Sequence, residues 1–145
     1  MKKIIFILLP FFLMNSINAI EKTKQEKVAK FVLENIQKDY KSCYAFYKLA
    51  AETFKKNKAD KTVVNGLNKS ADITLKFTHD LGEVLALKPK IMAENNQKEI
   101  KKLSRIARKN FNKLADDYGL MCKNLVENQK QRIDYWEAKG NKKIK

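Results

Sequence analysis

Apolar side chains recur at every third or fourth residue through almost the whole chain after position 20. This spacing matches one face of an α-helix, and no segment alternates with the two-residue period of a strand. Glycine and proline, which interrupt helices, number only 4 and 2 among 145 residues. The pattern therefore predicts an all-α fold, and the length of the chain predicts a single domain with one core.

Three amphipathic segments make up this pattern. They cover residues 21–57, a stretch that begins after Asp60, and residues 97–138. Asp60 is a residue type that caps helix N-termini, so we expect it to begin the second helix. Gly140 is expected to end the third helix and to leave residues 140–145 as a flexible basic tail. Pro89 marks either a kink in the second helix or the first turn of a new one.

Residues 1–19 have the pattern of a signal peptide. Lys2 and Lys3 precede an apolar run from 4 to 13, and a stretch of small and polar residues ends at Ala19. The run is shorter than the roughly 20 residues that a membrane span requires, although an uncleaved anchor is the alternative. We therefore expect a mature chain that starts at Ile20, has no transmembrane span and forms a helical domain over 20–139. Its expected location is periplasmic or secreted.

Cys43 and Cys122 are the only cysteines of the chain. In an oxidising compartment, an isolated pair is most simply one disulfide. With His79 as the only histidine, the pair cannot build a redox Cys-x-x-Cys motif, a haem attachment site or a zinc cluster. A bridge that closes a loop of this length contributes about 4 to 5 kcal/mol in the chain-entropy description.

The disulfide restricts the topology, because bridged Cα atoms lie within about 7 Å of each other. If the second helix ended before Pro89 and an unbroken third helix followed, Cys122 would lie roughly 25 Å beyond Cys43 along the axis. A second helix kinked at Pro89 that continues to a turn at residues 95 and 96 removes this offset. We therefore expect a three-helix up-down-up bundle with the first and third helices parallel. The alternative is a four-helix bundle with a break at 116–119.

The strongest surface feature is a stripe of cations in the third segment. The chain carries 31 basic and 16 acidic residues, a formal net charge of +15. The stripe lies opposite the apolar face of its helix, and we expect it to face solvent as a basic ridge that attracts an acidic protein or anionic envelope lipid. A solvated lysine-rich face is the alternative. Its residues are Lys98, Lys101, Lys102, Arg105, Arg108 and Lys109.

Nucleic acid is a disfavoured partner. Most of the basic residues are lysines, whereas arginine is the usual residue for recognising phosphates and base edges. The sequence also contains no nucleic-acid-binding motif and no aromatic stacking platform.

Catalytic, cofactor and metal sites are not expected. His79 lacks a second histidine for a metal site, and it is expected to be a surface residue. Asp116 and Asp117 point about 100° apart on a helix, so they do not form a carboxylate pair. Tyr40, Tyr44, Phe46 and Tyr47 surround Cys43, and we expect a core around the disulfide with phenol groups that reach water. A partner-binding aromatic patch is the alternative.

Three stretches carry a recognisable pattern: Cys43 to Tyr47 early in the chain, and Tyr118 to Lys123 and Arg132 to Trp136 near its end. In these stretches the chain resembles small exported bacterial proteins of unassigned function that contain two cysteines and are helical. Gln129 stands where the pattern has a proline. The resemblance supports the disulfide and implies no activity. Arg132, Tyr135 and Trp136 are expected to close one end of the bundle, with a docking site as the alternative.

These observations predict an exported, non-enzymatic helical protein that acts by binding an anionic partner at the bacterial envelope. The alternative is an inhibitor or immunity-type protein that docks an exported enzyme or toxin through its aromatic residues. No cofactor is expected.

Overall fold

The computed structural model describes residues 19–144. The predicted signal peptide, apart from Ala19, lies outside the described residues. Every secondary-structure element in the described part is an α-helix, which confirms the all-α prediction. The five helices are α1 (Ala19–Lys56), α2 (Lys61–Val84), α3 (Pro89–Lys109), α4 (Phe111–Glu127) and α5 (Gln129–Lys143).

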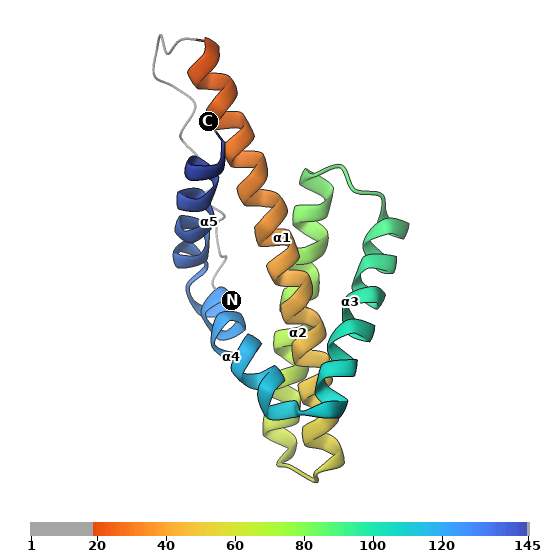
Figure 1. Cartoon of the computed structure of the whole chain (residues 1–145). Coiled ribbons are helices and arrows are strands. Elements are labelled where there is room, and N and C mark those ends of the chain that lie inside the picture. Colours follow the sequence, from red (N-terminus) through yellow and green to blue (C-terminus); the bar gives the residue numbers. More distant parts are fainter. Residues whose placement is uncertain (1–18, 145) are drawn as a thin grey trace, which may run out of the picture.

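The longest helix, α1, is the axis of the molecule and contacts each of the other four. Its 38 residues span about 57 Å. In Figure 1, α2 and α3 lie on one side of α1, and α4 and α5 lie on the other. The apolar stripe of α1 supplies much of the core, including Ile36, Tyr40, Cys43, Phe46, Tyr47 and Leu49.

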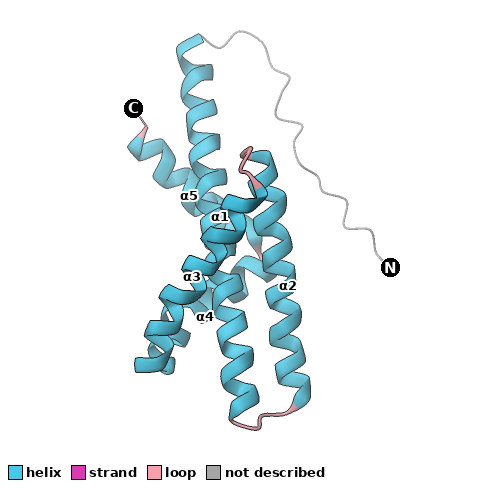
Figure 2. Ribbon diagram, turned by 90° about the vertical axis from the view of Figure 1, so that its right-hand side faces the viewer, coloured by secondary structure: helices cyan, strands magenta, loops and turns pink. Residues whose placement is uncertain are grey.

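A short turn joins α1 to α2, and the two helices form the most extensive interface (Figure 2). Lys58 closes α1 in the left-handed conformation, with φ 56°, and the N–H of Ala59 donates to the carbonyl of Phe54 at 3.0 Å. Asp60 accepts from the backbone N–H of Thr62 at 2.6 Å, which confirms the predicted cap. Hydrogen bonds from Thr62 hold the pKa of Asp60 below its ordinary value.

The chain reverses direction before Pro89, so the predicted kinked helix is wrong. α2 ends at Val84, and Ala86, two residues later, adopts the left-handed conformation with φ 55°. Lys88 is extended, at φ −66° and ψ 138°, because the proline ring disfavours helical geometry in the preceding residue. Pro89 is the first residue of α3, where its missing N–H costs no hydrogen bond. Residues 95 and 96, the predicted turn, lie inside α3.

A second reversal occurs at one residue, Asn110, between α3 and α4. Its backbone is extended, at φ −161° and ψ 101°. The N–H of Asn110 donates to the carbonyl of Ile106 at 2.9 Å, and its side chain accepts from the N–H of Lys113 at 3.1 Å. Asn110 therefore closes one helix and caps the next. Residues 19–144 form five helices instead of the expected three, and 116–119 lies inside α4.

After this reversal, α4 and α5 run antiparallel to α1 (Figure 1). The predicted third helix, residues 97–138, runs parallel to α1 only as far as Lys109. Beyond Asn110 the predicted parallel direction is wrong, because the prediction contains no turn there. Four contacts establish the antiparallel direction, since residues earlier in α1 contact residues later in α4 and α5. From the C-terminal to the N-terminal part of α1, they are Phe54 with Phe111, Phe46 with Tyr118, Cys43 with Cys122, and Phe31 with Trp136.

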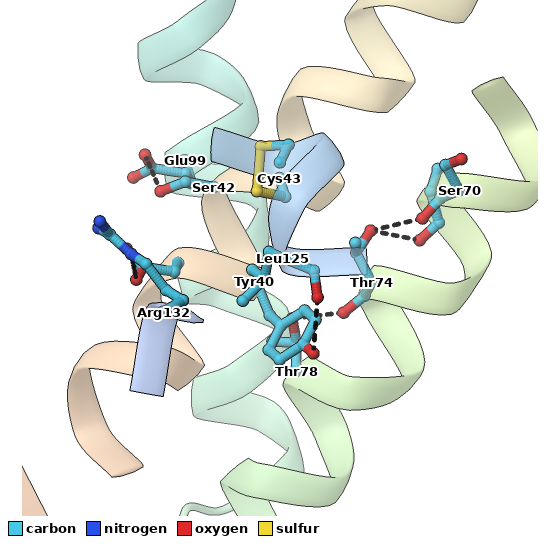
Figure 3. Close-up of a disulfide and its surroundings, with 12 residues drawn as sticks. Tyr40, Ser42, Cys43, Ser70, Thr74, Thr78, Glu99, Leu125 and Arg132 are labelled. Carbon is cyan, nitrogen blue, oxygen red and sulfur yellow. Dashed lines mark hydrogen bonds and ion pairs between the residues drawn. A yellow bond between two sulfur atoms is a disulfide. The ribbon is translucent and has the colours of Figure 1, made fainter. Parts of the chain in front are cut away.

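The predicted disulfide between Cys43 and Cys122 is present. Its Cα atoms are 5.3 Å apart, it joins residues separated by 79 positions, and both cysteines are fully buried. It therefore ties α4 to the centre of α1 (Figure 3).

Asn128 separates α4 from α5, and α5 then continues to Lys143. Gly140 does not end this helix. A Cβ atom at Gly140 would lie 3.1 Å from side-chain atoms of both Val28 and Phe31. The absence of a side chain at Gly140 therefore lets α5 pack closely on α1. The predicted tail is therefore wrong for residues 140–143.

Candidate functional site

The predicted basic ridge lies on the exposed face of α3. All six of its residues, Lys98, Lys101, Lys102, Arg105, Arg108 and Lys109, are exposed. The opposite face of α3 is anchored by Met92 and Leu103, which are buried. Figures 1 and 2 show α3 on the outside of the molecule. The ridge is therefore open to a partner along its length.

Glu99, the acidic residue within the ridge sequence, turns toward α1. Its carboxylate accepts from the hydroxyl of Ser42 at 3.0 Å and from the Nζ of Lys102 at 3.1 Å (Figure 3 shows the first contact). The hydrogen bond to Glu99 raises the pKa of Lys102. Within the described part of the chain, no ion pair engages the other five ridge cations. Most of the positive charge of the ridge is therefore not neutralised by carboxylates of the described residues.

A lysine of α1 extends this basic surface. Lys41 is half-buried, and burial lowers its pKa. The positive charges of Lys38 and Lys102 lower it further, whereas the carboxylate of Glu99 raises it. Lys41 of α1 therefore lies near Glu99 and Lys102 of α3, and Lys38 precedes Lys41 by about one helical turn on α1. The spacing of cations along the chain gives no sign of Lys41, because only the packing of α1 against α3 brings it near the ridge.

A second polar cluster joins α5 to α1 through Asp39. Arg132 donates to the Asp39 carboxylate from Nε at 2.7 Å and from Nη2 at 3.2 Å, and Trp136 donates from Nε1 at 2.5 Å. Asp39 is buried in the apolar stripe of α1. The sequence analysis does not predict a role for Asp39. Its spacing, three residues after Ile36 and four before Cys43, puts a carboxylate on the apolar face of α1, and this spacing could have identified it.

The aromatic rings of this cluster carry cations on their faces. The Arg132 guanidinium lies 4.4 Å from the ring centroid of Tyr135, and the Nζ of Lys139 lies 4.7 Å from the same ring. Trp136 meets Phe31 of α1 edge to face, with centroids 6.0 Å apart. Interaction with Lys139 lowers the pKa of Tyr135. The polar atoms of Arg132 and Trp136 thus bind α1, while Tyr135 remains exposed.

The aromatic residues around the disulfide form part of the core. Tyr40 is 1% exposed and stacks on Phe77 with centroids 4.9 Å apart. Its hydroxyl donates to the carbonyl of Leu125 at 3.5 Å instead of reaching water (Figure 3). Burial raises the pKa of Tyr40 well above its ordinary value. Phe46 and Tyr47 are also buried, and Tyr44 packs against the core. These residues therefore pack as part of the core around the disulfide.

The remaining polar candidates lie apart from the ridge. His79 is half-buried on α2. Asp117 pairs with Lys113 at 3.1 Å on α4. Within residues 19–144, no group of three or more histidine, cysteine, aspartate or glutamate side chains is placed to hold a metal ion.

None of the helices in the described residues is long and apolar enough to cross a membrane. No protein-family model, curated protein or solved structure matches the chain.

Proposed function

We propose that this protein is an exported, non-enzymatic helical binding protein of the bacterial envelope, and that it contacts an anionic partner through the basic ridge on α3. The observation that carries the proposal is the set of five exposed ridge cations that form no ion pair among the described residues. Lys41, half-buried on α1, adds a further cation near Lys102 of the ridge. Such a field raises the local concentration of anionic partners and speeds their association.

Export is supported by the buried disulfide, because such bonds persist mainly outside the reducing cytosol. The predicted signal peptide supports the same location. Mass spectrometry of protein from a bacterial periplasm tests both. The expected species begins at Ile20 and contains no free thiol.

Binding to immobilised polyglutamate tests the ridge. We expect the double variant Lys101→Gln with Arg105→Gln to elute at a lower salt concentration than the wild type. The matched control is Lys55→Gln with Lys69→Gln, which removes the same charge from α1 and α2. Equal elution of the two double variants would show that net charge, and not the ridge, governs binding.

A further inference from the structure

The turn between α2 and α3 exposes apolar side chains at the end of α3 that precedes the ridge. Val84, in the last turn of α2, is 67% exposed, and Ile91, in the first turn of α3, is 43% exposed. The exposed Lys88 and Lys90 lie between them in the sequence. Leu87 is half-buried in the same turn. In Figure 1 this turn is at the upper end of α3, separated from the turn that joins α1 to α2 by the length of the helices.

Ile91 lies on the same helical face as the centre of the ridge. It precedes Lys98 by seven residues and Arg105 by fourteen, which is a spacing of about two helical turns per step. One face of α3 therefore begins with an exposed aliphatic side chain and continues with cations. Glu94 is the exposed acidic residue between the two parts.

The turn is held in place by close packing. Gly82 is buried, and a Cβ atom there would overlap the Sδ atom of Met92. Met92 is 2% exposed, so the first turn of α3 is fixed against the last turns of α2. Pro89 further restricts the backbone at the start of α3. The exposed apolar residues thus occupy fixed positions relative to the ridge.

A lipid surface accommodates the exposed aliphatic side chains of the turn and the cations of the ridge at the same time. Aliphatic side chains gain free energy in the acyl region, while flanking lysines keep their ammonium groups at the level of the phosphates. Protein interfaces depend mostly on tryptophan, tyrosine and arginine anchors, and of these the ridge has only the arginines, Arg105 and Arg108. Residues 98–109 contain no aromatic residue. We infer that the anionic partner is a bilayer rich in anionic phospholipid, with the ridge on its headgroups and Val84 and Ile91 inserted. This inference rests on the proposed function.

Co-sedimentation with vesicles tests the inference. The purified protein is mixed with vesicles of phosphatidylglycerol and phosphatidylcholine, and with vesicles of phosphatidylcholine alone. We expect salt-sensitive binding to the first kind and little to the second. The Lys101→Gln, Arg105→Gln variant should bind about 25-fold more weakly, since each cation near an anionic surface contributes about fivefold. Glu94→Gln should strengthen binding.

Insertion of the turn has its own variants. Ile91→Ser and Val84→Ser should each weaken vesicle binding about fivefold. The control is Leu120→Ser on α4, where a leucine that is 70% exposed lies away from the turn. Relative to the wild type, which already contains Trp136, an Ile91→Trp variant should show additional blue-shifted emission and quenching by brominated lipid on binding, whereas Leu120→Trp should not.

Each negative result would overturn a different claim. Ile91→Ser and Val84→Ser variants that bind as well as Leu120→Ser would overturn insertion, while ridge-dependent vesicle binding would stand. Absence of vesicle binding, together with ridge-dependent binding to polyglutamate, would overturn the lipid partner and favour an acidic protein. Ridge-independent binding to both probes would overturn the proposed function as well.

Discussion

The carboxylate of Asp39 in α1 is the point at which Arg132 of α5 is held against the rest of the molecule. Arg132 donates two hydrogen bonds to it, at 2.7 and 3.2 Å, across 93 residues of sequence. The side chains of Arg132 and Asp39 are only 23% and 12% exposed. A charge pair shielded in this way is sensitive to the loss of either partner, because the other is left without compensation.

Replacing Asp39 by Asn should therefore destabilise the fold. The amide preserves the shape but loses the charge that Arg132 and Trp136 share, and we expect a cost of about 2 kcal/mol. Urea-induced unfolding with the disulfide intact measures this free energy. The control is Asp134→Asn, which removes an exposed pair with Lys130 and should change stability by about 0.5 kcal/mol or less. Equal effects of the two variants would contradict the structural role given to Asp39.

Replacing Ala86 by Gly should stabilise the protein. Ala86 adopts a left-handed conformation, with φ 55°, which costs a residue with a Cβ atom about 1 to 2 kcal/mol and costs glycine almost nothing. We expect a gain of about 1 kcal/mol in thermal or urea unfolding. Ala93→Gly, at an exposed position inside α3, should lose about 1 kcal/mol. Destabilisation by Ala86→Gly would show that α2 does not end in this turn.

Stability should fall as the pH rises above about 10. Burial raises the pKa of Tyr40 in the folded protein, whereas the same phenol in the unfolded chain ionises near pH 10. Between pH 10 and the raised pKa of folded Tyr40, the unfolded state binds fewer protons than the folded state. Unfolding therefore becomes more favourable as the pH rises through this range. One such group contributes a slope of about 1.4 kcal/mol per pH unit.

The variant Tyr40→Phe isolates this effect. Its unfolding free energy should fall less steeply above pH 10 than that of the wild type. Burial also raises the pKa of Tyr47, so a smaller slope should remain. Tyr135→Phe serves as the control, since the pKa of Tyr135 is lowered and not raised. A Tyr40→Phe curve parallel to that of the wild type would show that Tyr40 ionises freely in the folded state.

Asn96 presents the opposite case, a buried polar atom without a partner. Its Oδ1 accepts no hydrogen bond from residues 19–144, and the residue is 6% exposed. Because an unpaired buried acceptor costs about 1 to 3 kcal/mol, Asn96→Leu should be neutral or stabilising. Unfolding measurements on this variant and on Gln97→Leu, an exposed neighbour, test the expectation. A loss of more than about 2 kcal/mol in Asn96→Leu alone would contradict the absence of a partner for this oxygen.

The helical nature of the chain, the cap at Asp60 and the disulfide could be predicted because they depend on local spacing and residue type. The helix directions could not. The apolar period continues across Asn110 from Ile106 to Phe111 and Leu114, so a break of one residue leaves no gap in the pattern. The distance limit between Cys43 and Cys122 is met equally well by a longer second helix and by an additional reversal.

The candidate site, like the fold, could be predicted only in part from the sequence. The ridge follows from the spacing of cations along one helix, and the structure places all six of its residues on an exposed face. The contribution of Lys41, and the pairing of Asp39 with Arg132, depend on how α1 meets α3 and α5. Those contacts join residues more than fifty positions apart, and periodicity within one helix carries no information about them.

Partitioning of the protein between envelope membranes and the periplasmic fraction of a bacterial host tests the central claim most directly. We predict that the wild type is exported, is recovered with the membranes at low salt, and is released by high salt. The Lys101→Gln, Arg105→Gln variant should be exported equally and recovered in the periplasmic fraction, whereas the Lys55→Gln, Lys69→Gln control should remain with the membranes. Equal partitioning of the two variants, or retention of the wild type in the cytoplasm, would contradict the account.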